Sequence, residues 1–322
     1  MVITVSWRMI VLAVSCAALS ICMVLANAEL SRNFYASGCP NVEAIVRNRL
    51  RRIVRRDRTA RAAMIRLAFH DCQVNGCEAS IMLNSVRNGT AELQSPSNLG
   101  IRRLDIIDRL KARVEAACPR TVSCADIIAM ASRDAVSLSG GPDIPVLLGR
   151  FDGLRASAAA ATAALPHATI SVEGMLALFG RMGMTLPESV AILGAHTMGI
   201  AHCANFANRL YPVRDPSLRL FFANSLRARC PRMFSSNAFA ALDTSNFRFD
   251  NAYFRNVLAG RGLLSIDAEL GLDPRTGPVV ANFASNPDVF FRFFSSAFIK
   301  LTSFRVLSSS DGEVRRNCRL SN

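Results

Sequence analysis

The chain has 322 residues, 51% of them hydrophobic, and a formal net charge of +14. This length is enough for one large core, or for two lobes that share a cleft. The positive charge is nearly all arginine, because Lys111 and Lys300 are the only lysines. An acidic polysaccharide partner and a solvated basic surface both explain this charge. A nucleic-acid partner is disfavoured, because we find neither a nucleic-acid motif nor basic residues interleaved with aromatic ones.

The N-terminal 28 residues have the pattern of a signal peptide. Arg8 provides a positive charge, residues 9–25 are almost entirely apolar or small, and Ala26-Asn27-Ala28 forms an A-x-A cleavage site. A membrane anchor is the alternative, but the apolar stretch is short and ends in that cleavage signature. We therefore predict a mature chain, residues 29–322, that is secreted to the extracellular space or cell wall and does not associate with a membrane.

Apolar periodicity predicts a mainly α-helical protein. Residues 41–58 place apolar side chains at helical spacing with arginines opposite them. By the same reasoning we expect helices over residues 59–70, 104–117, 123–138, 171–181, 187–211, 214–229 and 290–302. Residues 84–100, 153–164 and 234–253 are predicted to be loops. The alanines of 153–164 favour a helix by propensity, but the segment has no apolar stripe. Period-2 alternation is almost absent, so the fold class is all-α.

Ten cysteines occur in the chain, two of them in the predicted leader. An even number of cysteines in an exported protein predicts disulfides, here four of them. Spacing alone does not choose among the possible pairings. The cysteines that remain are Cys39, Cys72, Cys77, Cys118, Cys124, Cys203, Cys230 and Cys318.

Residues 66–80 combine several reactive side chains in a short segment. Arg66 and His70 are four residues apart, so on a helix they share one face, with Phe69 beside them. Cys72 and Cys77 can close a short loop, around which Asp71, Glu78 and Ser80 offer oxygen atoms. One face of this segment is suited to proton transfer and the other to binding a hard cation.

His196 lies among small residues that would let a flat group approach it closely. A single histidine in such a setting is more often a packed core residue than a ligand. A zinc site built from His196, His202 and Cys203 is a further alternative, but Cys203 is needed for an even disulfide count.

Motifs along nearly the whole mature chain resemble those of the plant secretory (class III) haem peroxidases. The similarity runs from Phe34 to Arg319 and includes Arg66-x2-Phe69-His70-Asp71-Cys72, Val74-x-Gly76-Cys77, Ser123-Cys124-Ala125-Asp126, Gly149-Arg150, Gly194-Ala195-His196-Thr197, Phe249-Asp250-Asn251 and Asp267-x-Glu269-Leu270. The resemblance implies two helical lobes around haem b. The distal lobe would span about 29–150 plus the C-terminal segment, and the proximal lobe about 151–300. The disulfides implied are Cys39–Cys118, Cys72–Cys77, Cys124–Cys318 and Cys203–Cys230.

The same resemblance implies roles on both sides of the haem. His196 would be the axial iron ligand, and Asp267 would accept its other ring N–H. On the distal side His70 would be the general base, and Arg66 would stabilise the charge that develops as the O–O bond breaks.

Three further residues match family positions near the haem. Asn98 would accept a hydrogen bond from the distal histidine, and Phe69 would shield the iron face. Pro166 matches the exposed haem edge where reducing substrates dock.

Two calcium sites are also implied by the resemblance. The distal ligands would be Asp71, Val74, Gly76, Glu78 and Ser80, with Glu92 acting through water. The proximal ligands would be Thr197, Asp243, Ser245 and Asp250. This chain departs from the family pattern in having glutamate for aspartate at 78, Gln73 for an aromatic residue, Arg103 for glycine and Ile144 for tryptophan. The segment 243–250 is also one residue shorter than usual, so a serine or Thr244 would replace a threonine ligand.

The resemblance implies an enzyme that reduces hydrogen peroxide and oxidises small phenolic donors in one-electron steps. We therefore expect a secreted monomer that acts in cell-wall cross-linking, peroxide removal or stress responses, with Asn88 as a glycosylation site. The alternative is a catalytically silent peroxidase-fold protein that binds the wall through its basic surface. The intact set at positions 66, 70, 98, 196 and 267 argues against it, since a structural role needs none of them. A secreted hydrolase is disfavoured because no G-x-S-x-G motif is present.

Overall fold

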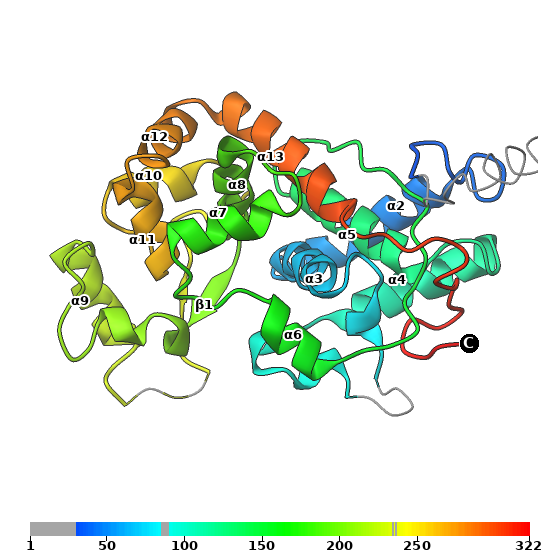
Figure 1. The fold of residues 1–322 in the computed structure, drawn as a ribbon, viewed down its shortest axis with the longest axis horizontal. Helices are drawn as coiled ribbons and strands as arrows, with labels where there is room; N and C mark the ends of the chain where they lie inside the picture. The colour runs from blue at the N-terminus through cyan, green and yellow to red at the C-terminus, as the bar shows by residue number, and fades with distance from the viewer. Residues whose placement is uncertain (1–29, 85–89, 234, 236) are drawn as a thin grey trace, which may run out of the picture.

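The computed structural model describes residues 30–84, 90–233, 235 and 237–322. The predicted signal peptide and the Asn88 sequon lie outside these residues. Within them the chain is mainly helical, as predicted (Figure 1). The helices are α2 (Val42–Arg56), α3 (Ala60–Val74), α4 (Leu104–Ala117), α5 (Cys124–Ser137), α6 (Ala158–Ala164), α7 (Val172–Gly180), α8 (Leu186–Leu193), α9 (Leu220–Arg229), α10 (Ala252–Leu258), α11 (Ser265–Leu272), α12 (Gly277–Ser285) and α13 (Pro287–Thr302).

Two short strands, β1 (Ile200–His202) and β2 (Phe239–Ala241), form an antiparallel pair in which Ala201 lies opposite Ala240. Short 3₁₀ turns occur at Ser80–Met82, Glu92–Gln94, Pro96–Asn98, Gly194–Thr197, Cys203–Asn205 and Ala207–Arg209. None of the helices in the described ranges is both long and apolar enough to cross a membrane.

Helices α2, α3 and α4 pack around α5 in the N-terminal half of the chain (Figure 1). The apolar residues of α2 recur at helical spacing, so Val46, Leu50 and Val54 are buried while the arginines at 52, 55 and 56 are exposed. Helix α5 is buried over nearly its whole length. This arrangement makes α3, the helix that carries Arg66 and His70, a central element rather than a surface one.

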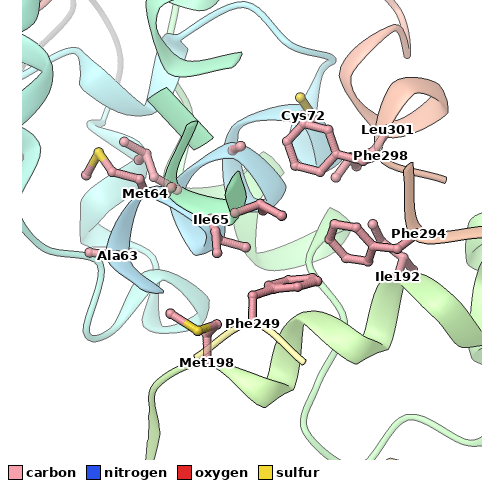
Figure 2. Packing of buried hydrophobic residues seen from close by; sticks show 14 of the residues in the cluster. Ala63, Met64, Ile65, Cys72, Ile192, Met198, Phe249, Phe294, Phe298 and Leu301 are labelled. Atoms are coloured by element: carbon pink, nitrogen blue, oxygen red, sulfur yellow. The ribbon is translucent and has the colours of Figure 1, made fainter. Parts of the chain in front are cut away.

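Phenylalanines hold the C-terminal helices together. Phe290 of α13 lies 4.9 Å from Phe254 of α10 and 6.0 Å from Phe283 of α12, measured between ring centroids. Phe249 and Phe294 extend this cluster toward Ile65 of α3 and Met198 (Figure 2). Helix α13 packs on both α3, which carries His70, and α8, which leads into the 3₁₀ turn that carries His196.

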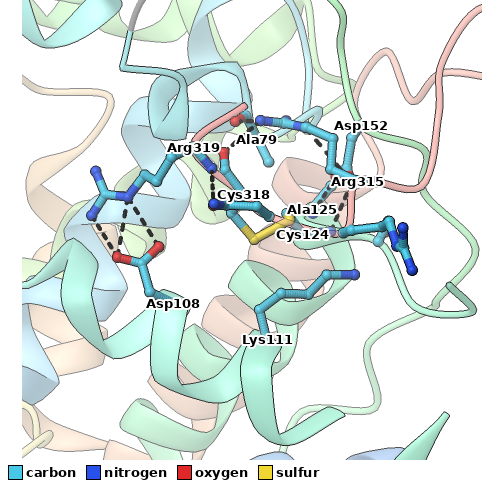
Figure 3. The surroundings of a disulfide bond; sticks show 12 residues. Ala79, Asp108, Lys111, Cys124, Ala125, Asp152, Arg315, Cys318 and Arg319 are labelled. Carbon is cyan, nitrogen blue, oxygen red and sulfur yellow. Dashed lines mark hydrogen bonds and ion pairs between the residues drawn. A yellow bond between two sulfur atoms is a disulfide. The ribbon is translucent and has the colours of Figure 1, made fainter. Parts of the chain in front are cut away.

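The four disulfides are the pairs that the resemblance implies: Cys39–Cys118, Cys72–Cys77, Cys124–Cys318 and Cys203–Cys230. The third joins the start of α5 to the C-terminal segment (Figure 3). Beside it the buried Arg315 donates through Nη2 to the carbonyls of Glu78 and Ala79, at 3.1 and 2.9 Å. The last residues of the chain therefore hold the loop that follows Cys77.

A buried ion pair occupies the centre of the N-terminal half. Arg150 Nη1 lies 2.6 Å from Asp126 Oδ1, and both side chains are fully buried. Tyr35 Oη and the Gly149 amide donate to the other carboxylate oxygen, while Arg150 Nε donates to the Thr302 carbonyl at 2.7 Å. Two of the motifs found in the sequence are thus structural, because their charges neutralise each other in the core.

Residues 153–164 are not a loop throughout, which corrects our prediction. Helix α6 begins after Ser157, whose Oγ accepts a hydrogen bond from the Ala160 amide at 3.1 Å. Its buried residue Ala161 and the following Leu165 pack with Val74 and Phe69. The helix needs no wide apolar stripe, because alanine has high helix propensity and small side chains allow close packing against α3.

The predicted helix over 187–211 was also wrong beyond Leu193. Helix α8 begins with a Thr185–Glu188 capping box and Pro187 in its first turn, as the proline suggested. After Leu193 the chain tightens into the 3₁₀ turn Gly194–Thr197 and then forms β1. The backbone of β1 pairs with β2, a partner about forty residues later that local periodicity does not reveal.

Other boundaries differ more modestly. The helix expected over 214–229 begins only at Leu220, and α3 continues to Val74 instead of ending at His70. The predicted loop 234–253 contains β2, and α10, α11 and α12 were not predicted at all. Arg103, which stands where the family has glycine, adopts a left-handed conformation with φ of 64°.

Candidate active site

The base candidate, His70, is held by its neighbours in one protonation form. Its Nδ1 lies 2.7 Å from Asn98 Oδ1, while Asn98 Nδ2 donates to the Glu92 carbonyl at 2.7 Å. With the amide fixed in this orientation, Nδ1 carries the ring proton and Nε2 keeps its lone pair. Burial and the charge of Arg66 lower the pKa of His70 to about 3, although the Asn98 hydrogen bond raises it. His70 is therefore a neutral base at physiological pH.

Arg66 is beside that lone pair. Its Nε donates to His70 Nε2 at 3.1 Å, and its Nη2 donates to the Leu99 carbonyl at 3.0 Å. The four-residue helical spacing places both side chains on one face of α3, as the sequence predicted. Phe69 meets the His70 ring edge to face, with centroids 5.8 Å apart, and limits how the imidazole can rotate. A cation and a base are thus adjacent, and the unprotonated nitrogen of the base accepts a hydrogen bond from the cation.

The second candidate histidine, His196, pairs with a carboxylate and lies on the 3₁₀ turn that follows α8. Its Nδ1 lies 3.0 Å from Oδ1 of Asp267, which is buried in α11. The Leu264 amide donates to Oδ2 of the same carboxylate at 2.9 Å. Burial alone would raise the pKa of Asp267, but the contact with His196 and these hydrogen bonds hold it below its usual value. Asp267 is therefore an anion that fixes the imidazole's orientation.

The other nitrogen of His196, Nε2, has no hydrogen bond to any described residue, and the side chain is 28% exposed. An oriented histidine with one free nitrogen is a suitable axial ligand for haem iron. We expected the small residues around His196 to let a flat group approach, but Gly194 is required for another reason. A Cβ there would lie 2.4 Å from Phe290 Cε2, so the glycine serves core packing.

The two histidine pairs come from adjoining elements. Gly199, two residues after Thr197, approaches α3 so closely that a Cβ there would lie 3.0 Å from the Ala62 Cβ. A Cβ at Gly100 would lie 3.2 Å from Arg66 Nη1 and 3.5 Å from His202 Nε2. His202 therefore lies near Arg66 and is not grouped with His196 and Cys203 as the zinc alternative requires, and Cys203 is in a disulfide.

Carboxylates without partners surround the loop after α3. Asp71 Oδ2 accepts from the Ala79 amide at 3.1 Å, but its Oδ1, the Ser80 hydroxyl and both oxygens of Glu92 are buried with no hydrogen bond. Burial and the charge of Glu92 raise the pKa of Asp71, and burial raises the pKa of Glu92 to about 7. Oxygen atoms left in this state fit a bound cation, which would satisfy them.

A second oxygen cluster lies behind His196. Thr197 Oγ1 donates to Asp243 Oδ2 at 2.7 Å, and Ser245 Oγ donates to Asp250 Oδ1 at 3.0 Å. Ser245, not Thr244, joins the cluster, because Thr244 Oγ1 accepts from Asn256 at 3.3 Å. Burial and Asp250 raise the pKa of Asp243 to about 6, against the hydrogen bond from Thr197. Nowhere among the described residues do three His, Cys, Asp or Glu side chains form a metal site by themselves. Hydroxyl and main-chain oxygens would have to contribute.

Pro166 lies two residues after the end of α6 and is half-buried. The preceding residue, Leu165, packs with Phe69, and Gln73 Nε2 donates to the Ala164 carbonyl at 3.4 Å. The end of α6 therefore lies against α3, the helix that carries His70. Sequence reasoning found Pro166 through the resemblance but missed the helix that positions it.

Comparisons with known proteins show the family to which the chain belongs. The family model described as Peroxidase matches residues 46–286. The chain belongs to the peroxidase family. It is 45% identical to Peroxidase 29 of Arabidopsis thaliana, over 91% of this chain and 89% of that protein. Peroxidase 28 and Peroxidase 50 of the same plant are 42% and 41% identical, over 92% and 93% of this chain. The resemblance to class III plant peroxidases is confirmed, and with it the all-α haem-peroxidase fold and peroxidase activity.

Sequence reasoning missed one residue of the site, Tyr253. Its hydroxyl donates to Asp267 Oδ1 at 2.8 Å, and its ring meets that of His196 edge to face at 5.8 Å. The tyrosine follows the Phe249-Asp250-Asn251 motif by two residues, which was the one available signal. No sequence pattern shows that α10 turns this hydroxyl toward α11.

Proposed function

We propose that this peroxidase is a secreted plant enzyme that reduces hydrogen peroxide and oxidises small phenolic donors by one-electron steps. The observation that carries the proposal is the coupling of Asn98, His70 and Arg66: one histidine nitrogen is held by an amide while the other keeps its lone pair beside a guanidinium. A structural protein would have no need for a buried base with a lowered pKa.

Haem is the cofactor that the family implies. His196 would hold its iron through Nε2, and the haem, when bound, supplies the redox chemistry. Asp267 strengthens His196 as an electron donor, because a carboxylate that accepts the Nδ1 proton gives the ring anionic character. We propose that the helices of about 29–150 with the C-terminal segment form one side of the haem site and those of about 151–300 the other.

His70 moves the proton in the proposed reaction. Nε2 accepts a proton from one oxygen of hydrogen peroxide and returns it to the other oxygen, which then leaves as water. Asn98 keeps Nδ1 protonated, so that Nε2 remains the accepting atom throughout. Arg66 stabilises the negative charge that builds up on the departing oxygen. Phe69 restricts imidazole rotation and covers the approach from its side.

Two calcium ions are part of the proposal. The orphaned oxygens of Asp71, Ser80 and Glu92 support a distal site completed by Glu78 and the carbonyls of Val74 and Gly76. The cluster of Thr197, Asp243, Ser245 and Asp250 supports a proximal one. Each cluster adjoins a proposed catalytic histidine in sequence. Calcium would therefore hold the histidines in place rather than take part in chemistry.

Export is proposed from the signal-peptide pattern and from the four disulfides, which form and persist in oxidising compartments. We propose that phenolic donors approach at Pro166, and the packing of the preceding residue, Leu165, with Phe69 of α3 supports this. Cross-linking of wall phenolics, removal of peroxide and responses to stress all use this one reaction.

The decisive experiment compares wild-type holoprotein with the His70→Ala variant. Both should show a haem Soret band, and the wild type should oxidise guaiacol with peroxide. The variant should react with peroxide about 10²–10⁴ times more slowly, the usual contribution of a positioned base. A wild-type holoprotein that binds haem without turnover would favour the silent wall-binding alternative. An unchanged peroxide reaction in the variant would refute the role of His70.

A further inference from the structure

A groove lined by arginines lies between α2 and α4, outside the site described above. It has a volume of about 620 Å³. Ala44, Ala112 and Ala116 form its small walls, and Arg49, Arg52, Arg109 and Arg113 surround them. Helix α2 contributes Arg49 and Arg52 one turn apart, and α4 contributes Arg109 and Arg113 one turn apart. Two helices thus present their guanidinium groups to a shared hollow.

The groove continues along α2. A second hollow of about 380 Å³ is lined by Arg49, Arg52, Arg55 and Arg56, so the two hollows share Arg49 and Arg52. At 1.5 Å per residue, the arginines of α2 extend over roughly 10 Å of helix. The surface is therefore an elongated track rather than a point site.

Acidic residues near the track do not neutralise it. Within the described part of the chain, Arg109 pairs with Asp105 at 3.1 Å, but Arg49, Arg52, Arg55, Arg56 and Arg113 are in no ion pair. Asp57 pairs with Arg103, and Glu115 pairs with Lys111 at 2.6 Å. The Nε of Arg49 is buried and has no hydrogen-bond acceptor. A buried guanidinium N–H without an acceptor is costly, and an anion in the groove would remove that cost.

We propose that this arginine track, made of Arg49, Arg52, Arg55, Arg56, Arg109 and Arg113, binds a linear polyuronate, that is, a polysaccharide with a carboxylate on successive sugars. A planar guanidinium can donate two parallel hydrogen bonds to a carboxylate, which the ammonium of lysine cannot. The side-chain amide of Asn48 also lines the groove and can bind a sugar hydroxyl. The choice of a wall polymer rests on the proposed secretion.

Nucleic acid is the other polyanion that such a surface would attract. Proteins that bind single strands usually stack bases on aromatic side chains, and neither hollow is lined by one. The lining chemistry, guanidinium groups with an amide and alanines, suits carboxylates and hydroxyls instead.

The test compares two triple variants of the mature holoprotein that lose the same charge. The groove variant is Arg49→Gln/Arg52→Gln/Arg113→Gln. The control is Arg181→Gln/Arg261→Gln/Arg292→Gln, whose arginines are exposed on other elements and in no ion pair. Binding to polygalacturonate is measured at several salt concentrations, with a neutral galactan and a single-stranded oligonucleotide as comparison probes. Guaiacol turnover, measured separately, reports on folding and on the proposed peroxidase function.

We expect the groove variant to bind polygalacturonate at least about tenfold more weakly, with a shallower salt dependence, because fewer counterions are displaced. The control should lose less than about threefold. Equal losses in both variants, tighter binding of the oligonucleotide, or no wild-type binding at physiological salt would each overturn the proposal. If the groove variant has a lowered melting temperature, the variant Arg49→Lys/Arg52→Lys/Arg113→Lys is used instead. It keeps the charges and the aliphatic parts of the side chains but cannot donate two parallel hydrogen bonds to a carboxylate, so its affinity should still fall.

Discussion

The hydroxyl of Tyr253 donates a hydrogen bond to Oδ1 of Asp267, the same oxygen that accepts from His196 Nδ1. Burial and the nearby carboxylate raise the pKa of Tyr253 well above its usual value, so the phenol stays protonated and remains a donor. A carboxylate that is shared between two donors attracts each proton less strongly. Tyr253 thus limits the anionic character that Asp267 gives to His196.

Replacing Tyr253 with phenylalanine should lower the ferric/ferrous reduction potential of the holoprotein. Loss of one hydrogen bond, worth about 0.5–1.5 kcal/mol, corresponds to roughly 20–60 mV for one electron. The potential is measured by spectroelectrochemical titration. Tyr211→Phe is the matched control, because that hydroxyl donates to the Cys230 carbonyl at 3.0 Å and not to the site. A raised potential in Tyr253→Phe would contradict the argument.

The reaction with peroxide should resist acid. Since the pKa of His70 is about 3 rather than the usual 6.5, Nε2 stays unprotonated at pH 5. We expect a rate constant that is constant from pH 7 to 5 and falls only toward pH 3, measured by stopped-flow pH jump. Asn98→Ala removes the hydrogen bond that raises the pKa of His70. The rate constant should therefore drop, because the base is weaker, and the pH at which it falls off should be lower. An inflection near 6.5 would contradict the assignment.

The same shift affects stability, with a definite sign. Unfolded chains bind a proton at this histidine below pH 6.5, whereas the native state binds it only near pH 3. The lowered pKa of His70 therefore costs no stability above pH 6.5. Between pH 6.5 and about 3 the free energy of unfolding should fall as the pH falls.

Chelation should destabilise the protein. Removal of the proposed calcium would leave Asp71 and Glu92 buried without a cation, so the melting temperature should fall and recover on re-addition. Gly153→Ala should weaken calcium binding, because its Cβ would lie 2.4 Å from Glu78 Oε2. Gly180→Ala is the control, since a Cβ there meets nothing within 4 Å. Calorimetry on both variants checks this; equal affinities would remove Glu78 from the site.

The Arg150–Asp126 pair should matter far more than a similar pair at the surface. Arg150→Met leaves Asp126 charged in the core and should cost about 3–5 kcal/mol of unfolding free energy. Arg319→Met breaks an equally well-formed pair with Asp108, whose side chain is 38% exposed, and should cost at most about 1 kcal/mol. Denaturant unfolding with disulfides intact measures both. Similar losses would mean that burial does not set the difference.

Local spacing was sufficient to predict that Arg66 and His70 lie on the same face of a helix, because residues four apart on a helix are neighbours. Helix α6 was not predictable in this way, since its stability comes from the Ser157 cap and from contacts with Val74 and Phe69. The break after Leu193 has a similar cause. It is set by Phe290 packing on Gly194 and by the pairing of β1 with β2, which are contacts between distant parts of the chain.

The partner of His196 could be predicted only through the family resemblance, since Asp267 is far away in sequence. Tyr253 could not be predicted even so, because its role depends on how α10 and α11 lie against each other. Side chains that meet on a single helix can be predicted from spacing, whereas side chains that meet between two helices cannot.

Arg315 and Cys318 bond to residues of the N-terminal half of the chain, and this has a consequence for biosynthesis. The carbonyls of Glu78 and Ala79 are bound by a side chain made more than two hundred residues later. While the ribosome is still working, the loop after Cys77 lacks these donors, and Cys124 lacks its sulfur partner. The loop that follows the His70 helix therefore cannot make its final contacts until the C-terminal segment has been translated.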